Sequence, residues 1–377
     1  MYNINRVIKK LTPHRSAAEL FKYFSDEKDC VFLDSSLVNG LGRYSIIGMR
    51  PYLKLVKDDH GFFINEQKVS ELSFEEYLKK YLSEHKDQNK SGLPMLSGAI
   101  GYFSYEYGRK LMEIPSHKEN LVTIPDAVLV FYDMYIIEDC HEKKTFLVAN
   151  GITEDAEKLI ESVEKRLTEV LLEKEQVADG SFNIEITPNF KKEEYKQAVD
   201  EMIRYIIEGD IYITNMTQQL EVKSNKKPLD VFYDLRENNP SPFGGYMDYG
   251  DFQIVCASPE RFLKMKKGHV NTRPIKGTRK RGEALEEDLL MRNELKNSEK
   301  DKSELLMIVD LERNDLNRVC KPGSVKVTEL FTVEEYATVF HLVSDIEGTL
   351  EEDKNFVDLM EAAFPGGSIT GAPKYRA

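Results

Sequence analysis

The spacing of hydrophobic and polar positions changes several times along the chain, and each change marks an element that we expect. In the first 150 residues, short apolar runs alternate with turn residues, which is typical of β-strands. The clearest of these runs are residues 52–56, 127–137 and 145–148. Two further strands are expected at residues 253–257 and 262–266.

Three segments instead have the 3.6-residue spacing of an amphipathic helix. The first opens at Thr153, the second covers residues 191–207 and ends at Gly209, and the third begins at about Lys300. Strands and helices cluster along the chain rather than alternating strictly. The pattern therefore favours an α+β fold with a largely antiparallel sheet over a doubly wound parallel fold.

The polar stretch 173–189 is the best linker candidate, because it contains Ala-Asp-Gly-Ser at residues 178–181. We accordingly divide the chain into an N-terminal region, residues 1–175, and a C-terminal region, residues 190–377. The sequence contains no internal repeat and no low-complexity tract.

Composition narrows the class of protein. The 377 residues are 41% hydrophobic and 31% charged, as in ordinary globular enzymes, and 65 acidic against 52 basic residues argue against a general nucleic-acid binder. The four cysteines are scattered, which fits reduced thiols rather than a disulfide framework or a zinc site. Residues 1–30 have no apolar leader and no run is long enough to span a membrane, so we expect a cytoplasmic protein.

The densest cationic segment, residues 273–282, is expected to form a turn and holds Lys276 near its centre. Pro274 and Gly277 restrict the backbone around it, and four other cations lie within five residues. Like charges disfavour the ammonium form, so Lys276 is a candidate nucleophile, and its cationic neighbours would attract an anionic substrate. The alternative is a solvated basic hairpin or loop tip.

The third helix carries a carboxylate on its expected apolar side. Glu304 falls between Met307, Ile308 and Leu311 when the residues are placed 100° apart. A carboxylate in such a place must be paired, protonated or bound to a cation. The alternative is a capping box, with Asp301 as N-cap and Glu304 at the third helical position.

Two other features are weaker. Glu260 follows an apolar strand, at a strand end where catalytic groups often stand, although an ordinary ion pair with Arg261 explains it as well. The glycine-rich segment 366–374 follows a short amphipathic helix, and its amides and hydroxyls are suited to holding a carboxylate. It does not have the P-loop spacing, and a plain loop is the alternative.

Together these segments resemble the chorismate-utilising enzymes, and within that family most closely the aminodeoxychorismate synthase group. The resemblance implies the single α+β fold of the family, with two packed, largely antiparallel sheets flanked by helices. The matching motifs, in chain order, are FLDSS (32–36), GRYSI (42–46), GDIY (209–212), NPSP (239–242), SPERF (258–262), RPIKGT (273–278), MIVDLERNDL (307–316), KPGSV (321–325), HLVS (341–344) and GGSITGAPK (366–374).

Position 276 separates the groups within the family. Anthranilate synthase large subunits have alanine at this position, whereas Lys276 is similar to the aminodeoxychorismate synthases. The resemblance thus implies amination of chorismate to 4-amino-4-deoxychorismate, a step of p-aminobenzoate and folate biosynthesis. It also implies a covalent intermediate on the lysine and ammonia supplied by a glutamine amidotransferase subunit.

The resemblance further implies roles for single residues. Lys276 is the nucleophile, Glu260 the general acid that protonates the departing hydroxyl, and Glu304 a Mg²⁺ ligand. The expected substrate-binding residues are Gly277, Thr278, His341, Gly367, Ser368, Thr370 and Gly371. The residues that match a tryptophan pocket of some relatives are Ser36, Arg43, Tyr44, Ser45, Ile46, Pro240, Ser241 and Pro242.

The chain departs from the family pattern in two places. Ile213 and Thr214 precede Asn215 where relatives usually have G-D-x-Y-Q-x-N. Family members also continue with a second Mg²⁺-ligating glutamate, a substrate-binding arginine and another glycine-rich loop, so the chain is C-terminally incomplete relative to them. The alternatives are therefore anthranilate synthase component I, another chorismate-utilising enzyme, or a truncated subunit that binds its amidotransferase partner or tryptophan without turnover.

Overall fold

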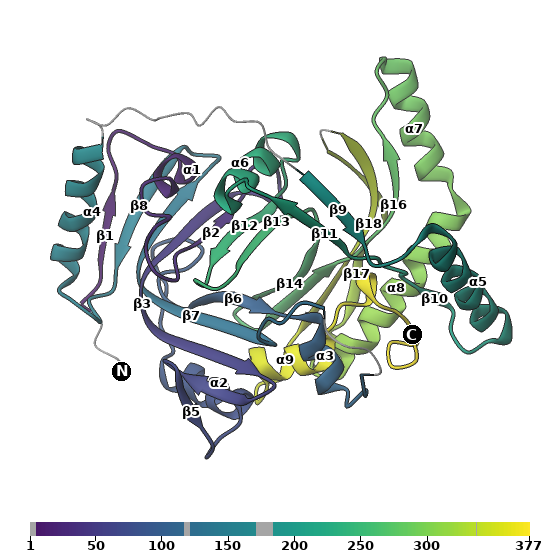
Figure 1. The fold of residues 1–377 in the computed structure, drawn as a ribbon, viewed down its shortest axis with the longest axis horizontal. Coiled ribbons are helices and arrows are strands. Elements are labelled where there is room, and N and C mark those ends of the chain that lie inside the picture. The colour runs from purple at the N-terminus through teal and green to yellow at the C-terminus, as the bar shows by residue number, and fades with distance from the viewer. Residues whose placement is uncertain (1–4, 117–120, 171–183, 337) are drawn as a thin grey trace. The chain divides into compact units, whose positions relative to one another are not determined.

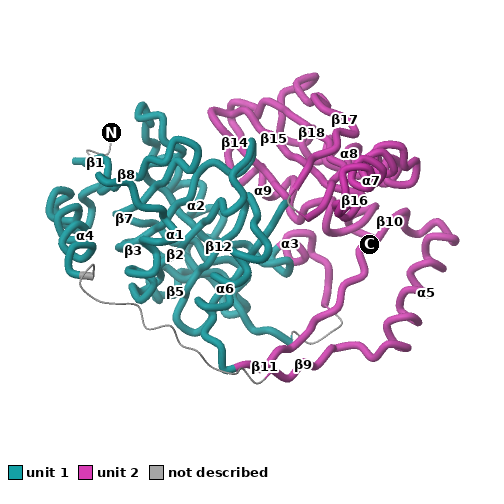
Figure 2. Tube along the Cα trace, turned by 90° about the horizontal axis from the view of Figure 1, so that it is seen from above, with its two compact units in different colours: residues 1–107, 118–182, 225–259 teal, residues 108–117, 183–224, 260–377 magenta. Residues whose placement is uncertain are grey.

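The computed structural model describes residues 5–116, 121–170, 184–336 and 338–377. The chain forms two compact units, each built from separated stretches of sequence (Figure 2). Unit 1 comprises residues 1–107, 118–182 and 225–259, and unit 2 comprises residues 108–117, 183–224 and 260–377. Residues 225–259 thus belong with the N-terminal stretches, although they lie in our predicted C-terminal region. The predicted boundaries concern family regions rather than compact units, and they stay a prediction.

Unit 1 contains an antiparallel sheet of ten strands within the described residues, in the order β1-β8-β7-β3-β2-β12-β13, with β4, β5 and β6 attached to its flank (Figure 1). The strands are β1 Val7–Lys10, β2 Val31–Asp34, β3 Tyr44–Asp58, β4 Gly61–Ile64, β5 Gln67–Val69, β6 Ala99–Phe103, β7 Ala127–Asp139, β8 Lys144–Ala149, β12 Phe243–Asp248 and β13 Gln253–Ser258. The helices that begin in unit 1 are α1 Ala17–Phe21, α2 Phe74–Glu84, α3 Tyr105–Leu111, α4 Ala156–Val170 and α6 Pro228–Asn238.

Both faces of this sheet carry a hydrophobic core. Phe32, Ile47 and Ile136 point to a core that helices α1, α4 and α6 complete, and Val31, Val130 and Ile137 point to the core on the opposite face. Every residue of β7 is buried, which explains why residues 127–132 and 134–137 are all apolar or aromatic instead of alternating with polar residues. The three strands predicted in the first 150 residues are confirmed as parts of β3, β7 and β8.

Unit 2 contains a five-stranded antiparallel sheet in the order β14-β15-β18-β16, with β17 also paired to β18. Helices α7 and α8 contact this sheet, and α9 contacts α8 (Figure 1). Leu305, Val309, Phe340, Leu342 and Ile346 are central to the core between them. The elements are β14 Arg261–Lys266, β15 His269–Arg273, β16 Ile275–Lys280, β17 Lys326–Glu335, β18 Val339–Thr349, α7 Leu285–Asn297, α8 Glu299–Asn317 and α9 Phe356–Ala363.

The remaining elements of unit 2 include two short sheets. The predicted helix 191–207 is confirmed as α5 Lys192–Glu208, and Gly209 ends it with a left-handed φ of 82°. Part of the predicted linker is wrong, because residues 184–188 form a strand; the linker residues before 184 lie outside the described residues. The elements are β9 Ile184–Pro188 paired with β11 Leu220–Ser224, β10 Ile213–Thr214 paired with β19 Gly371–Ala372, and the 3₁₀ turn η1 Gly367–Ile369.

All strand pairings in the described part of the chain are antiparallel, and helices flank both main sheets. The predicted α+β class with largely antiparallel sheet is confirmed. No helix within the described ranges is long and apolar enough to cross a membrane.

Candidate active site

Lys276 lies on strand β16, so the prediction of a turn or loop tip is wrong. The pairing of β16 with β18 shifts register between Ile275 and Thr278, which is a β-bulge. Gly277, at the bulge, has φ +82°, and a Cβ there would lie 2.9 Å from Cβ of Asp301 on helix α8. Only glycine satisfies both the backbone conformation and the close approach of the helix.

The amine of Lys276 is held by two acceptors. Its Nζ donates to Ser368 O at 2.9 Å and to Asn215 Oδ1 at 3.2 Å. Asn215 in turn donates through Nδ2 to Thr370 O at 2.7 Å and to Ser368 O at 3.3 Å. Because carbonyl oxygens only accept, this arrangement fixes the amide with its oxygen toward Lys276.

The other cations around Lys276 do not form an unpaired positive cluster. Three of the four neighbours are bound to carboxylates of unit 2, so their charges are largely compensated where they lie. From the sequence we expected the positive charges of these neighbours to favour a free amine on Lys276. Because three of the four neighbours are paired with carboxylates, that reason is wrong. The pairs are Arg273 with Glu329, Glu334 and Asp345, Arg279 with Glu294 and Asp301, and Arg281 with Asp288.

Glu260 stands at the start of β14, next to the same segment. Its Oε1 accepts from the backbone N–H of Ile275 at 3.3 Å, and its carboxyl also hydrogen-bonds the Ser368 side chain. Burial raises the pKa of Glu260, while these hydrogen bonds and the charge of Lys276 lower it by smaller amounts. Lys276, Glu260 and Ser368 are thus brought together, and their catalytic and substrate-binding roles stay a prediction.

The glycine-rich segment wraps over helix α8. A Cβ on Gly367 would lie 2.8 Å from Leu311 Cδ2, so a larger residue does not fit without displacement. Thr370 Oγ1 donates to Gly366 O at 3.0 Å, and Ser368 Oγ lies 3.3 Å from Ile275 O. Gly371, in β19, pairs with β10. These contacts place the segment directly beside Lys276.

His341 and Thr278 face each other across strands β18 and β16. Thr278 Oγ1 lies 2.9 Å from His341 Nδ1, and the two residues are register partners. Burial lowers the pKa of His341, so the imidazole is neutral at pH 7. Gly277 and Thr278 directly follow Lys276 on β16, and His341 lies opposite Thr278 on the adjacent strand β18. These three predicted substrate residues therefore lie close to Lys276 in the fold.

Glu304 is not part of a capping box, which was the alternative that the sequence left open. Helix α8 has Ser298 as its N-cap, whose Oγ accepts from the N–H of Asp301, so Asp301 occupies the third helical position. Glu304 lies one turn further on, and its side chain is 36% exposed. Its ion pair is with Lys300, at 3.7 Å, rather than with Lys276.

Glu304 offers one oxygen ligand for a divalent cation. The described residues contain no cluster of three or more histidine, cysteine or acidic groups that would enclose a metal. Mg²⁺ is commonly held by one or two carboxylates, with water and substrate oxygens completing its shell. The partly exposed carboxylate fits that kind of open site, and magnesium binding stays a prediction.

Helix α8 has three buried acids, Asp301, Glu312 and Asp315, and of these Glu312 has no charged partner among the ion pairs of the described residues. The sequence pattern did not lead us to single out Glu312. The buried stripe of the helix runs through Leu305, Ile308, Val309 and Glu312, while Glu304 lies at its border. Burial raises the pKa of Glu312 to about 8. The signal was present in the sequence, since Glu312 follows Leu305 by seven residues, which is two helical turns.

The residues that match a tryptophan pocket come together within unit 1, although about 200 residues separate them in sequence. Ser241 N donates to Ser36 Oγ at 2.9 Å, and Ser36 Oγ donates to Ser241 O at 3.2 Å. The buried Ser241 Oγ has no hydrogen-bond partner in the described part of the chain. Arg43 pairs with Asp139 at 2.7 Å, and Ser45 Oγ donates to Asp34. Binding of tryptophan by this group stays a prediction.

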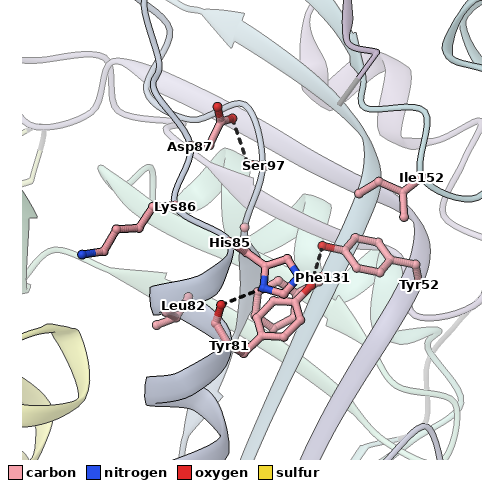
Figure 3. A pocket seen from close by; sticks show the side chains of 10 residues that line it. Tyr52, Tyr81, Leu82, His85, Lys86, Asp87, Ser97, Phe131 and Ile152 are labelled. Carbon is pink, nitrogen blue, oxygen red and sulfur yellow. Dashed lines mark hydrogen bonds between the residues drawn. The ribbon is translucent and has the colours of Figure 1, made fainter. Parts of the chain in front are cut away.

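A cavity of about 290 Å³ in unit 1 contains none of the predicted site residues. Figure 3 shows Tyr81 and His85 side by side in its wall, with ring centroids 3.9 Å apart, and Tyr52 joined to Tyr81 through their hydroxyls. The cavity is lined by Tyr52, Tyr81, Leu82, His85, Lys86, Asp87, Ser97, Gly98, Phe131 and Ile152.

Comparison with known families decides the class of this site. Residues 30–377 match the sequence model of a family described as chorismate binding enzyme. The chain belongs to this family. The amine of Lys276, the carboxyl of Glu260 and the glycine-rich segment of unit 2 therefore lie in a chorismate-utilising enzyme.

Related members of the family have two different names. Anthranilate synthase component 1 of Acetivibrio thermocellus is 35% identical over 380 residues, which cover 95% of this chain and 76% of the relative. Aminodeoxychorismate synthase component 1 of Bacillus subtilis (strain 168) is 36% identical over 349 residues, covering 89% and 73%. The crystal structure of anthranilate synthase component I from Streptococcus pneumoniae TIGR4 superimposes with a TM-score of 0.79 at 29% identity, covering 90% of this chain and 76% of that one. The family and its fold are thus established, and the choice between the two activities depends on the site.

Proposed function

We propose that this chorismate-binding enzyme aminates chorismate at C4 to give 4-amino-4-deoxychorismate. The observation that carries the proposal is the amine of Lys276, which is held beside the partly buried carboxyl of Glu260 in unit 2. The family resemblance implies that anthranilate synthases have alanine at that position. A lysine provides a nucleophile that an alanine cannot.

The proposed reaction has two displacements. The lone pair of Lys276 Nζ forms a bond to C2 of the ring, the two conjugated double bonds shift, and the C4–O bond breaks as Glu260 gives its proton to the departing hydroxyl, which leaves as water. Ammonia then bonds to C4, the two double bonds shift back, and the C2–N bond breaks, which frees Lys276. The new ammonium group loses one proton, which restores Glu260, so that chorismate and ammonia give the aminated product and water.

The surroundings of each group suit its role. Lys276 Nζ donates to two neutral acceptors, Asn215 Oδ1 and Ser368 O, which hold the amine in place near Glu260. Burial raises the pKa of Glu260, which favours the protonated form that a general acid needs. Mg²⁺ bound at Glu304 would supply positive charge to offset a substrate carboxylate. A separate glutamine amidotransferase subunit would supply the ammonia.

Anthranilate synthase activity is the second candidate, because relatives with that name match this chain as well as those named aminodeoxychorismate synthase. That reaction places ammonia directly at C2 and needs no lysine. The two activities therefore differ in their product and in the formation of a lysine adduct.

Product identification tests the proposal. The purified chain is incubated with chorismate, Mg²⁺ and ammonium chloride, which replaces the amidotransferase, and the products are separated and identified by mass and fluorescence. We expect 4-amino-4-deoxychorismate, which a lyase converts to p-aminobenzoate. Formation of anthranilate as the main product would contradict the proposal and favour the second candidate.

A further inference from the structure

Glu312 is a buried acid of helix α8 and packs against the glycine-rich segment that holds Lys276. Its side chain lies within the helix–sheet core, and the residue is 7% exposed. A Cβ on Gly367 would lie 3.5 Å from Glu312 Cγ, so the glycine-rich segment packs directly against it. Such a carboxyl requires either a cation or a proton.

The hydrogen bonds around Thr272 decide between a cation and a proton. Thr272 Oγ1 lies 2.6 Å from Phe262 O and 2.9 Å from Glu312 Oε2. A threonine hydroxyl has one hydrogen, and the carbonyl oxygen of Phe262 can only accept, so Thr272 must donate to Phe262. The contact with Glu312 is then a hydrogen bond only if the acid carries a proton and donates to Thr272.

The charged groups near Glu312 agree with this assignment. Glu260, before β14, and Asp315, on α8 itself, are both acidic and disfavour a second negative charge. The cation nearby, Lys374, is bound to Asp315 at 2.6 Å. Burial is the largest cause of the raised pKa of Glu312, and the two acids add to it.

We infer that Glu312 is a protonated positioning residue for Glu260. Its O–H donates to Thr272, and Thr272 donates to the carbonyl of Phe262, which is two residues beyond Glu260 in strand β14. The chain of hydrogen bonds ties the strand start that carries the acid to helix α8. Because Glu312 is neutral, it adds no charge beside Glu260. The inference rests on the proposed role of Glu260 as general acid.

The first test measures the proton by its effect on stability. The native state of the wild type keeps a proton that the unfolded state releases above a pH of about 4.5. The free energy of unfolding of the wild type must therefore fall relative to that of Glu312→Gln as the pH rises from about 4.5 toward the native pKa of Glu312, about 8. Above that pKa the difference between the two proteins stops growing. Asp310→Asn on the same helix, an exposed carboxylate, is the matched control.

We expect the urea midpoint of Glu312→Gln to rise steadily relative to that of the wild type between pH 5 and 8. The midpoint of Asp310→Asn should differ from that of the wild type by a nearly constant amount over the same range. A difference for Glu312→Gln that does not change with pH means that Glu312 is ionised in the native state. That outcome overturns the inference without any measurement of activity.

The second test measures positioning. Glutamine can still donate to Thr272, whereas leucine fills a similar volume without a donor. We expect Glu312→Leu to speed amide hydrogen exchange in residues 260–266 and at Ile275, whose N–H donates to Glu260, and Glu312→Gln to restore the wild-type exchange. For chorismate consumption, Glu312→Leu should lower kcat roughly 10-fold with little change in KM, because misplacement of a catalytic group acts on the chemical step.

Equal exchange and equal kcat in the leucine and glutamine variants would overturn the positioning role. These results are separable from the proposed function, because chorismate consumption is measured whichever product forms. Anthranilate as the wild-type product would contradict the proposed function while leaving the comparison of the two Glu312 variants intact. Failure of Glu312→Gln to rescue would contradict only the inference.

Discussion

At the scale of the residue, an ionisable group is defined by what it touches more than by its neighbours in sequence. Lys276 has four cations within five residues, yet three of these are paired with carboxylates and its own amine contacts two neutral oxygens. Glu304 and Glu312 lie on one helix, and only Glu312 is buried. The contacts of a side chain in the folded protein, rather than its neighbours in sequence, therefore indicate which chemistry it can perform.

Replacement of Lys276 tests whether it is a nucleophile or an attracting charge. Lys276→Arg keeps the positive charge, but a guanidinium stays protonated and cannot attack, so we expect a loss of activity of roughly 100-fold or more. Lys276→Ala should lose aminodeoxychorismate formation to the same extent. Wild-type protein quenched with chorismate should show a mass adduct on the peptide that contains Lys276. An active arginine variant that forms no adduct would contradict the covalent mechanism.

At the scale of the element, the bulge in β16 and the register of helix α8 position the side chains of the site. The bulge in β16 places Lys276 next to Ser368 while Gly277 lies against α8. The register of α8 is set by Ser298, which caps the helix at its N-terminus. A shift of either element would separate the amine from the acid.

Substitution of Gly277 tests the bulge. Gly277→Ala must adopt φ +82° and bring its Cβ within 3.0 Å of Leu295 and 2.9 Å of Asp301. We expect a stability loss of about 2–4 kcal/mol, from left-handed strain together with the clash, and loss of activity. Gly268→Ala is the control, since Gly268 also has a left-handed φ, +78°, but nothing lies within 4 Å of its added Cβ.

The control should lose only about 1–2 kcal/mol, the cost of the backbone conformation. Unfolding curves in urea of both variants measure the difference. Equal losses in the two variants would show that the contact between the bulge and α8 contributes nothing.

At the scale of the whole molecule, the compact units do not follow the order of the sequence. Strand β12 of residues 225–259 pairs with β2 near the N-terminus, with Tyr246 opposite Phe32. Arg236 on α6 pairs with the buried Asp34 at 2.8 Å. The sheet of unit 1 is therefore complete only when both stretches are present.

Fragments cut at the linear boundary test this organisation. We expect residues 1–175 and residues 190–377, expressed separately, to lack cooperative unfolding, because the first loses the partner of Asp34 and the second exposes the unpaired edge of β12. Near-ultraviolet circular dichroism and limited proteolysis measure the effect. Co-expression of the two fragments should restore the fold. A separate 190–377 fragment with a sharp unfolding transition would contradict the expectation.

The sequence by itself determined the secondary structure of long periodic segments. Helix α5, strands β3, β7 and β8 and the α+β class follow from residue spacing, since that spacing reflects local geometry and burial of one face. The resemblance of ordered motifs also selected Lys276, Glu260 and the glycine-rich segment as one site before any contact was known.

Only the tertiary structure decided the contacts between distant residues. The sequence placed Lys276 on a turn, because the bulge depends on pairing with β18 and not on local residues. It placed Glu304 on the apolar face and did not single out Glu312, because a helical projection gives relative angles while the packed sheet fixes which face is buried. The proton on Glu312 depends on Thr272 and Phe262, which are 40 and 50 residues away. Burial and hydrogen bonding across such separations are properties of the folded chain, because the packing of non-local segments creates them.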